Sequence, residues 1–316
     1  MDKHNNLITI LGPTATGKTR LAAELANLID AEIISADSRQ VYRGMDLGTG
    51  KDLQDYKVNG KSIPYHLIDI VDPGYEYNVF EFQKDFLKAY QEIINRGKRV
   101  ILCGGSGMYL DAVLKGYHLK QVPENIELRD KLALMNEDLL KEKLLGFGKV
   151  HNETDLIDRN RLIRAIEIRE FEKVQPLTHD FPSFSSLNFG IHFEREEIRK
   201  RISSRLINRL ENGMVKEVKD LLDKGFTPEQ LMFYGLEYKY VTQYVLGELR
   251  YNDLYQKLNT AIHQFAKRQM TWFRRMEKQG TQIIWIDGNL NSAEKINIIQ
   301  TKIKKPTINN GRPALR

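Results

Sequence analysis

Residues near the N-terminus have the types and the spacing needed to bind phosphate. Gly12, Gly17, Lys18 and Thr19 match the P-loop pattern Gly-x4-Gly-Lys-Ser/Thr. The whole loop is Gly12-Pro13-Thr14-Ala15-Thr16-Gly17-Lys18-Thr19. In such a loop, backbone N–H groups and the positive end of the following helix converge on phosphate. Lys18 adds a positive charge, and the Thr19 hydroxyl is placed to ligate Mg²⁺. The loop therefore predicts a phosphate site but does not say which phosphate compound it holds.

The sequence around this loop alternates between strand and helix patterns. An aliphatic run at 7–11 predicts a buried strand before the loop, and apolar residues with helical spacing follow Thr19. A further helix is predicted at 79–94, and further strands at 31–36, 65–71, 99–103, 188–193 and 282–286. We therefore predict an α/β fold with a parallel sheet flanked by helices. Its ligands should bind beyond the carboxyl ends of the strands.

Two short segments follow predicted strands and should lie at the same sheet edge as the P-loop. Asp37 follows the second strand, where its carboxylate could help to hold Mg²⁺ or accept a proton from a nucleophile. An aspartate here also suits a helix cap or a turn, and spacing alone does not decide between these roles. Ser106 offers a hydroxyl within Gly104-Gly105-Ser106-Gly107, where glycines let the backbone approach a ligand closely.

The chain changes character between 119 and 190. Strand-like runs stop there, and charged amphipathic patterns predict a helical insertion or a second domain. One helix should begin at Pro123 and include Leu134, and another should cover 160–168. Arg161 and Arg164 share a face of the second helix, and that face is either solvated or bound to a partner.

A later helix carries a stripe of arginines. Arg201, Arg205 and Arg209 recur every four residues and so share one face. This stripe faces either water or phosphate oxygens, to which arginine can bind through two N–H groups.

Composition sets broad limits. The chain has 316 residues, a net charge of +6 and a single cysteine, Cys103, and it has no apolar run of the length that spans a bilayer. Because the first strand begins so near residue 1, we expect no signal peptide and a cytoplasmic protein. The positive charge permits RNA or DNA as a partner without requiring either.

Several of these motifs occur together in an order that resembles the tRNA dimethylallyltransferases, over residues 7–275. The segments that carry the resemblance are 12–19, Ser35–Asp46, Gly48–Lys51, His66–Ile70, Gly104–Leu110, Arg161–Glu167 and Ala266–Arg274. The resemblance implies transfer of the isoprenoid of dimethylallyl diphosphate to the exocyclic N6 amine of the adenosine 3′ to the anticodon of tRNA. The P-loop would then hold the leaving diphosphate.

The resemblance also implies roles for individual residues. Asp37 would accept the proton of the amine, with Ser106 beside it, and Arg205 would stabilise the leaving group together with Lys18 and Mg²⁺ at Thr19. The tRNA would contact a set that includes Asp37 and Ser106 with Ser38, Arg39, Gln40, Arg129, Asn160, Arg161 and Arg164.

The same resemblance implies a domain plan. A P-loop NTPase-like catalytic core would comprise 1–118 and 190–302, an all-helical tRNA-binding insertion 119–189, and a flexible basic tail 303–316. We expect a monomer. The chain departs from the family at Ser106, where a threonine is usual, at Leu236, where an aromatic residue is usual, and at Leu156–Arg159, which replace His-Pro-Asn-Asp. These departures indicate a divergent member.

Three other functions use parts of the same pattern. An adenylate isopentenyltransferase would act on free nucleotide, but it needs no helical insertion that grips tRNA. A P-loop small-molecule kinase would transfer phosphate from ATP, but the sequence has no arginine-rich lid of the kinase type. A non-enzymatic RNA-binding module would leave the P-loop without a purpose.

Overall fold

The computed structural model describes residues 7–117, 119, 122–148, 156, 158–174 and 181–304. The chain divides into two compact units, one formed by Met1–Gly116 with Ser183–Arg316 and the other by Tyr117–Pro182. The return to the first unit at Ser183 precedes the boundary at residue 190 expected from the sequence. The reason is that the returning strand begins early, at Ser186, where it pairs with Leu7.

A six-stranded sheet forms the centre of the first unit, and every strand pair in it is parallel. The strand order is β5-β2-β6-β1-β7-β8. The bounds are β1 Leu7–Leu11, β2 Ala31–Ala36, β5 Tyr65–His66, β6 Arg99–Gly104, β7 Ser186–His192 and β8 Ile284–Asp287. This confirms the predicted α/β fold with a parallel sheet.

One predicted strand is much shorter than expected. The sequence pattern indicated a strand over 65–71, but β5 ends at His66. Leu67 and Asp69 have φ angles of 61° and 55°, which bend the chain out of the extended conformation. The segment rejoins the fold only through a bridge between Val71 and Tyr42.

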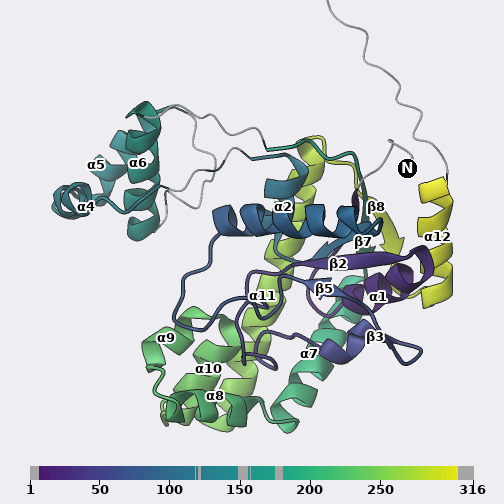
Figure 1. The fold of residues 1–316 in the computed structure, drawn as a ribbon. Coiled ribbons are helices and arrows are strands. Elements are labelled where there is room, and N and C mark those ends of the chain that lie inside the picture. Colours follow the sequence, from purple (N-terminus) through teal and green to yellow (C-terminus); the bar gives the residue numbers. More distant parts are fainter. Residues whose placement is uncertain are drawn as a thin grey trace, which may run out of the picture. The chain divides into compact units, whose positions relative to one another are not determined.

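Helices cover both faces of the sheet (Figure 1). On one face, α1 (Lys18–Ile29) and α12 (Ser292–Lys304) pack into an apolar core that includes Ile10, Ile33 and Ile101. On the other face lies α2 (Val79–Asn95), which contacts β2, β6 and α3 (Gly107–Leu114). A capping box between Asn78 and Glu81 starts α2, because each side chain bonds the backbone N–H of the other.

A group of helices extends the first unit beyond the carboxyl ends of the strands. Its members are α7 Arg195–Glu211, α8 Met214–Asp223, α9 Pro228–Phe233, α10 Leu236–Val245 and α11 Tyr251–Lys278. Helix α11 contacts α10 and α7 in this group and also α3 beside the sheet. It therefore connects this group of helices to the sheet and its covering helices within the first unit (Figure 1). The remaining short elements of this unit are η1 Leu53–Tyr56, β3 Lys57–Val58 and β4 Lys61–Ser62.

The second unit is helical. It contains α4 Ile126–Ala133, α5 Glu137–Leu145 and α6 Arg159–Val174 around a core of leucine and isoleucine side chains. The helix expected at 160–168 is present within α6. The helix expected from Pro123 begins instead at Ile126, because the Asn125 side chain accepts the N–H of Leu128 at 3.0 Å and caps it. Leu134 lies just past its end and is 91% exposed.

The remaining expectations concern the ends of the chain and the membrane. Helix α12 runs to Lys304, so the first two residues of the expected tail are helical, and residues 305–316 lie outside the described residues. Among the described helices, none is long and apolar enough to cross a bilayer.

Candidate active site

The register of the sheet brings three loops to one edge. Leu11 of β1 and Ala36 of β2 both lie opposite Gly104 of β6. The P-loop, Asp37 and the Gly105-Ser106 segment therefore leave the sheet side by side at the carboxyl ends of their strands. A side chain at Gly104 would overlap the Ala36 carbonyl, so glycine permits this close approach.

The P-loop closes on itself before α1 begins. The Thr16 hydroxyl donates to the Pro13 carbonyl at 2.9 Å, and the Lys18 ammonium donates to the same carbonyl at 3.1 Å. Gly17 caps α1 with a φ of 75°, a left-handed conformation that suits glycine. The loop thus turns sharply into the N-terminus of α1, where unpaired backbone N–H groups favour an anion.

A glutamine from α11 ties the P-loop to the Gly105-Ser106 segment. The backbone N–H of Thr14 donates to the Gln269 side-chain oxygen at 2.9 Å, and the Gln269 amide donates to the Gly105 carbonyl at 2.9 Å. Gln269 was not among the predicted site residues. Its motif, Ala266–Arg274, was the available signal.

Asp37 and its neighbours form a tight turn against Ser106. Asp37 Oδ1 accepts the Arg39 N–H at 2.9 Å, and Ser106 Oγ accepts the Ser38 N–H at 3.0 Å. Asp37 is therefore a turn residue, and its other oxygen, Oδ2, accepts no hydrogen bond from the residues that the structure describes. That oxygen can accept a proton or contact a ligand.

Two of the predicted tRNA contacts also serve the fold. The Gln40 amide donates to the Gly50 carbonyl at 3.1 Å, and its oxygen accepts from Ser35 Oγ at 3.1 Å. The Arg39 guanidinium lies over the Phe233 ring, 5.2 Å from its centroid.

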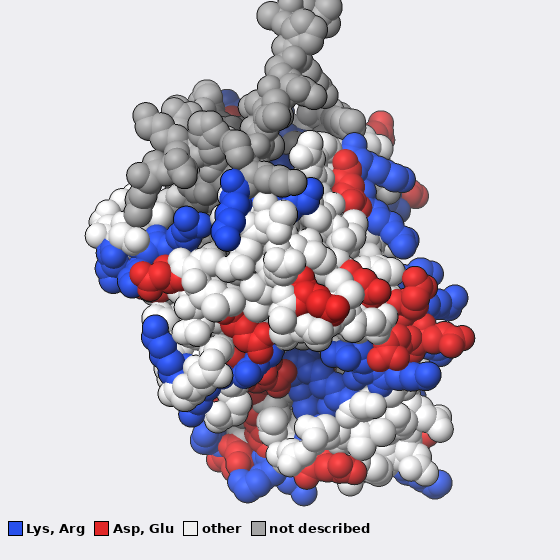
Figure 2. Space-filling view, turned by 90° about the vertical axis from the view of Figure 1, so that its right-hand side faces the viewer, with Lys and Arg blue, Asp and Glu red and all other residues white. Residues whose placement is uncertain are grey.

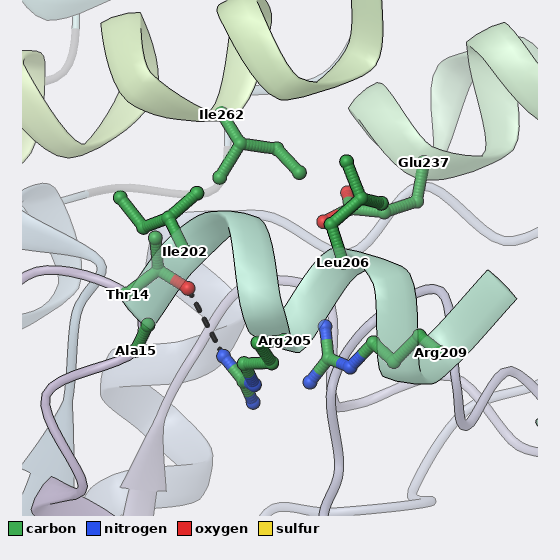
Figure 3. A pocket seen from close by; sticks show the side chains of 8 residues that line it. All are labelled: Thr14, Ala15, Ile202, Arg205, Leu206, Arg209, Glu237 and Ile262. Atoms are coloured by element: carbon green, nitrogen blue, oxygen red, sulfur yellow. Dashed lines mark hydrogen bonds between the residues drawn. The ribbon is translucent and has the colours of Figure 1, made fainter. Parts of the chain in front are cut away.

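The arginine stripe of α7 lies against the P-loop, although Arg201 is still exposed to solvent. Arg201 Nε donates to the Ala15 carbonyl at 3.0 Å. Arg205 Nη1 donates to Thr14 Oγ1 at 3.1 Å (Figure 3). Arg209, one turn further, is 8% exposed and bonds the Asp52 carboxylate at 3.3 Å. Arg209 and Asp52 were not among the predicted site residues.

Beside them is a pocket lined by Thr14, Ala15, Ile202, Arg205, Leu206, Arg209, Glu237 and Ile262 (Figure 3).

Positive side chains gather at this site, and three carboxylates, those of Asp37, Asp52 and Glu237, lie near them. Burial lowers the pKa of the Lys18 ammonium, and the nearby charge of Arg205 lowers it further, whereas Asp37 and Asp52 oppose this change. Burial also acts to raise the pKa of Asp52, but the charges of Arg205 and Arg209 outweigh it and hold that pKa below its usual value. Basic side chains gather in a hollow on the face drawn in Figure 2. An anion is the ligand that this site favours.

The oxygen donors at this edge fit Mg²⁺. Thr19 stands in the first turn of α1, and the Asp37 carboxylate leaves the same sheet edge. Mg²⁺ prefers oxygen and is often held by one or two protein groups together with substrate phosphates. Within the described ranges, no three Asp, Glu, His or Cys residues form a metal cluster.

In the second unit, two predicted tRNA contacts converge on a buried carboxylate. Arg129 Nε and Nη2 donate to Glu167 at 3.1 and 3.0 Å, and Arg164 Nη1 pairs with the same side chain. Arg129 and Arg164 therefore brace this unit while remaining partly exposed. Asn160 and Arg161 are exposed on α6.

Comparison with known proteins supports the motif resemblance. A family model described as IPP transferase matches residues 40–276. A tRNA dimethylallyltransferase 2 from Phocaeicola vulgatus is 58% identical over 307 residues, which are 96% of this chain and 100% of that protein. A tRNA dimethylallyltransferase 1 from Parabacteroides distasonis is 56% identical over 295 residues, covering 93% and 96%.

Solved structures agree. A tRNA isopentenylpyrophosphate transferase from Bacillus halodurans superposes with a TM-score of 0.69 at 30% identity, covering 95% of each chain. A eukaryotic dimethylallyltransferase acting on tRNA superposes with a TM-score of 0.75 at 25% identity, covering 94% of this chain and 77% of that one. The resemblance seen in the motifs is thus confirmed, and the chain belongs to the IPP transferase family.

Proposed function

We propose that this protein transfers the dimethylallyl group of dimethylallyl diphosphate to the N6 amine of the adenosine 3′ to the anticodon of tRNA. The observation that carries the proposal is the meeting of an anion site and a carboxylate at one sheet edge. Lys18 belongs to the P-loop and Arg205 bonds to it, and Asp37 directly follows β2, which is separated from β1 by β6. The relatives at 55–58% identity are named tRNA dimethylallyltransferases.

The residues suit each part of this reaction. The N6 lone pair attacks the first carbon of the dimethylallyl group, and the C–O bond breaks with its electron pair moving to the diphosphate. Asp37 accepts the proton that N6 loses. Lys18, Arg205 and the N–H groups at the start of α1 stabilise the negative charge that builds on the leaving diphosphate. The P-loop in this proposal holds a leaving group and splits no nucleotide.

Mg²⁺ held at Thr19 would neutralise part of the diphosphate charge and so assist its departure. Ser106 acts beside Asp37, because its hydroxyl fixes the turn at Ser38. Serine at this position keeps the hydroxyl that the usual threonine would supply.

The second unit supplies the surface for tRNA in this proposal. Asn160 and Arg161 are exposed, and Arg129 and Arg164 keep part of their guanidinium groups accessible beside Glu167. Such side chains bind RNA phosphates and base edges. We also place the protein in the cytoplasm, with its tRNA substrate, as a monomer.

A transfer assay tests the proposal against its rivals. The protein is incubated with Mg²⁺, dimethylallyl diphosphate labelled in the isoprenoid and either unmodified tRNA or AMP, with Lys18→Ala as the inactive control. We expect label in tRNA only. Label in AMP alone would indicate an adenylate isopentenyltransferase, and phosphate transfer from ATP would indicate a kinase; either result would contradict the proposal.

A further inference from the structure

Arg205 bonds to both Asp52 and the P-loop. The Asp52 carboxylate pairs with Arg205 Nη2, and the other nitrogen of the same guanidinium, Nη1, donates to Thr14 Oγ1 at 3.1 Å. Arg209 Nη2 reaches both oxygens of the same carboxylate, at 3.3 and 3.4 Å. The Asp52 carboxylate therefore accepts hydrogen bonds from two arginines beside the P-loop, Arg205 and Arg209.

The segment before Asp52 is held firmly at both ends. The buried Lys51 ammonium pairs with Asp46 at 2.9 Å and also with Asp69. Glu217 of α8 accepts three backbone N–H groups, those of Asp46, Leu47 and Gly48, at 3.0, 2.7 and 3.0 Å. These contacts hold the backbone that leads into Asp52 and so keep this residue beside the two arginines.

Arg205 and Arg209 lie very close to the backbone at Gly50, two residues before Asp52. A side chain there would overlap the Arg209 guanidinium and lie 3.0 Å from Arg205 Nη2. Gly50 also has a φ of 72°, which a larger residue adopts only with strain. The loop is thus built so that Arg205 and Arg209 lie against the segment that ends in Asp52.

We propose that Asp52 tunes the affinity of the diphosphate site by cancelling one of the two charges of Arg205 and Arg209. The inference rests on the proposed function, in which the P-loop holds diphosphate. A site that binds the donor too tightly also binds the released diphosphate too tightly, and turnover would then wait for its departure. A fixed carboxylate beside the arginines weakens both bound states and lets the product leave.

Asp52 could instead strengthen binding by positioning Arg205. The two roles predict different changes in diphosphate affinity when the charge of Asp52 is removed. An asparagine keeps an oxygen that accepts the arginine N–H groups but removes the charge. If charge matters, Asp52→Asn tightens diphosphate binding. If only positioning matters, it leaves the affinity unchanged or weakens it.

Calorimetry with inorganic diphosphate and Mg²⁺ separates these roles. We expect Asp52→Asn to lower the dissociation constant about three- to tenfold, as suits one partly screened surface charge. Asp52→Ser, a second neutral variant, should do the same if Asp52→Asn fails to fold, and Asp52→Glu should stay within about twofold of the wild type because it keeps the charge. Asp220→Asn is the matched control, since it removes a carboxylate from an exposed pair with Lys216 on α8 and should change nothing.

Two further observations complete the test. The gain in affinity should shrink as salt is raised, because added ions screen it. In the transfer assay, added diphosphate should inhibit Asp52→Asn at lower concentration than it inhibits the wild type.

A second variant separates a failure of the Asp52 inference from a failure of the proposed function. Lys18→Gln should weaken diphosphate binding strongly. If it does, and the neutral Asp52 variants bind no more tightly than the wild type, the inference is overturned and the proposed function stands. If the wild type does not bind diphosphate, or Lys18→Gln binds it equally well, both are overturned.

Discussion

Replacing Asp37 by asparagine should stop the chemistry while leaving the site assembled. Asp37 Oδ1 accepts the Arg39 N–H at 2.9 Å, and the side-chain oxygen of asparagine can accept the same bond. The turn that carries Ser38 and Arg39 should therefore persist. What is lost is the ability to take the proton from the adenosine amine.

The size of the effect follows from the role. A positioned general base contributes about 10²- to 10⁴-fold to a rate, or about 2.7–5.5 kcal/mol of barrier. Binding should respond differently, because Asp37 places a negative charge near Lys18. Its removal makes the anion site more positive, so the KM for dimethylallyl diphosphate should stay the same or fall by a few-fold at most.

The assay measures kcat and both KM values with unmodified tRNA, the dissociation constant for tRNA, and the thermal unfolding midpoint. We expect kcat to fall by at least about 100-fold, with tRNA affinity and the midpoint nearly unchanged. Asp72→Asn is the matched control, since it changes an exposed carboxylate paired with Arg43 and should leave kcat intact. A near-normal kcat for Asp37→Asn would remove Asp37 from the mechanism, and a loss of tRNA affinity together with a lower unfolding midpoint would indicate a structural role.

Three further predictions concern groups that support this chemistry. Burial lowers the pKa of Lys18 and bound diphosphate should raise it, so affinity for diphosphate should fall as alkaline pH passes the pKa of free Lys18; calorimetry on Lys18→Arg, which stays charged, should show no such fall. Gln269→Leu removes both bonds between the P-loop and Gly105 and should raise the donor KM and lower the free energy of unfolding in urea by about 1–3 kcal/mol, and no change in either would refute the bridge. Burial acts to raise the pKa of Glu167, but Arg129 and its other partners hold it below the usual value, so the stability it contributes is present above the ordinary glutamate pKa and is lost as pH falls through the lowered one. Glu167→Gln should cost about 1–3 kcal/mol at neutral pH and remove that part of the acid dependence in a circular dichroism titration, whereas an unchanged acid profile would contradict the assignment.

The parallel sheet and the positions of its loops could be predicted because local patterns determine them. Strand runs that alternate with helices predicted parallel pairing, and parallel pairing sends Asp37 and the P-loop to one edge. The strand expected over 65–71 was wrong beyond His66, because positive φ at Leu67 and Asp69 interrupts it and the apolar pattern carries no sign of that.

The supporting contacts of the site could not be predicted from spacing. Gln269 bonds to Thr14, 255 positions away, and Arg209 bonds to Asp52, 157 positions away. Such pairs are set by how α7 and α11 lie against the P-loop, and no local motif records this. The helical spacing put Arg205 and Arg209 on one face, but the sequence left open whether that face met water or the P-loop.

The central claim is tested most directly by the chemical identity of the product. Two anticodon stem-loop RNAs, with adenosine or guanosine at the position 3′ to the anticodon, are incubated with dimethylallyl diphosphate and Mg²⁺, digested and analysed by mass spectrometry, while released diphosphate is measured. The account predicts a dimethylallyl group on N6 of that adenosine, one diphosphate released for each group transferred, and no product from the guanosine RNA. An unmodified adenosine RNA alongside modified AMP, or modification at another nucleotide, would contradict it.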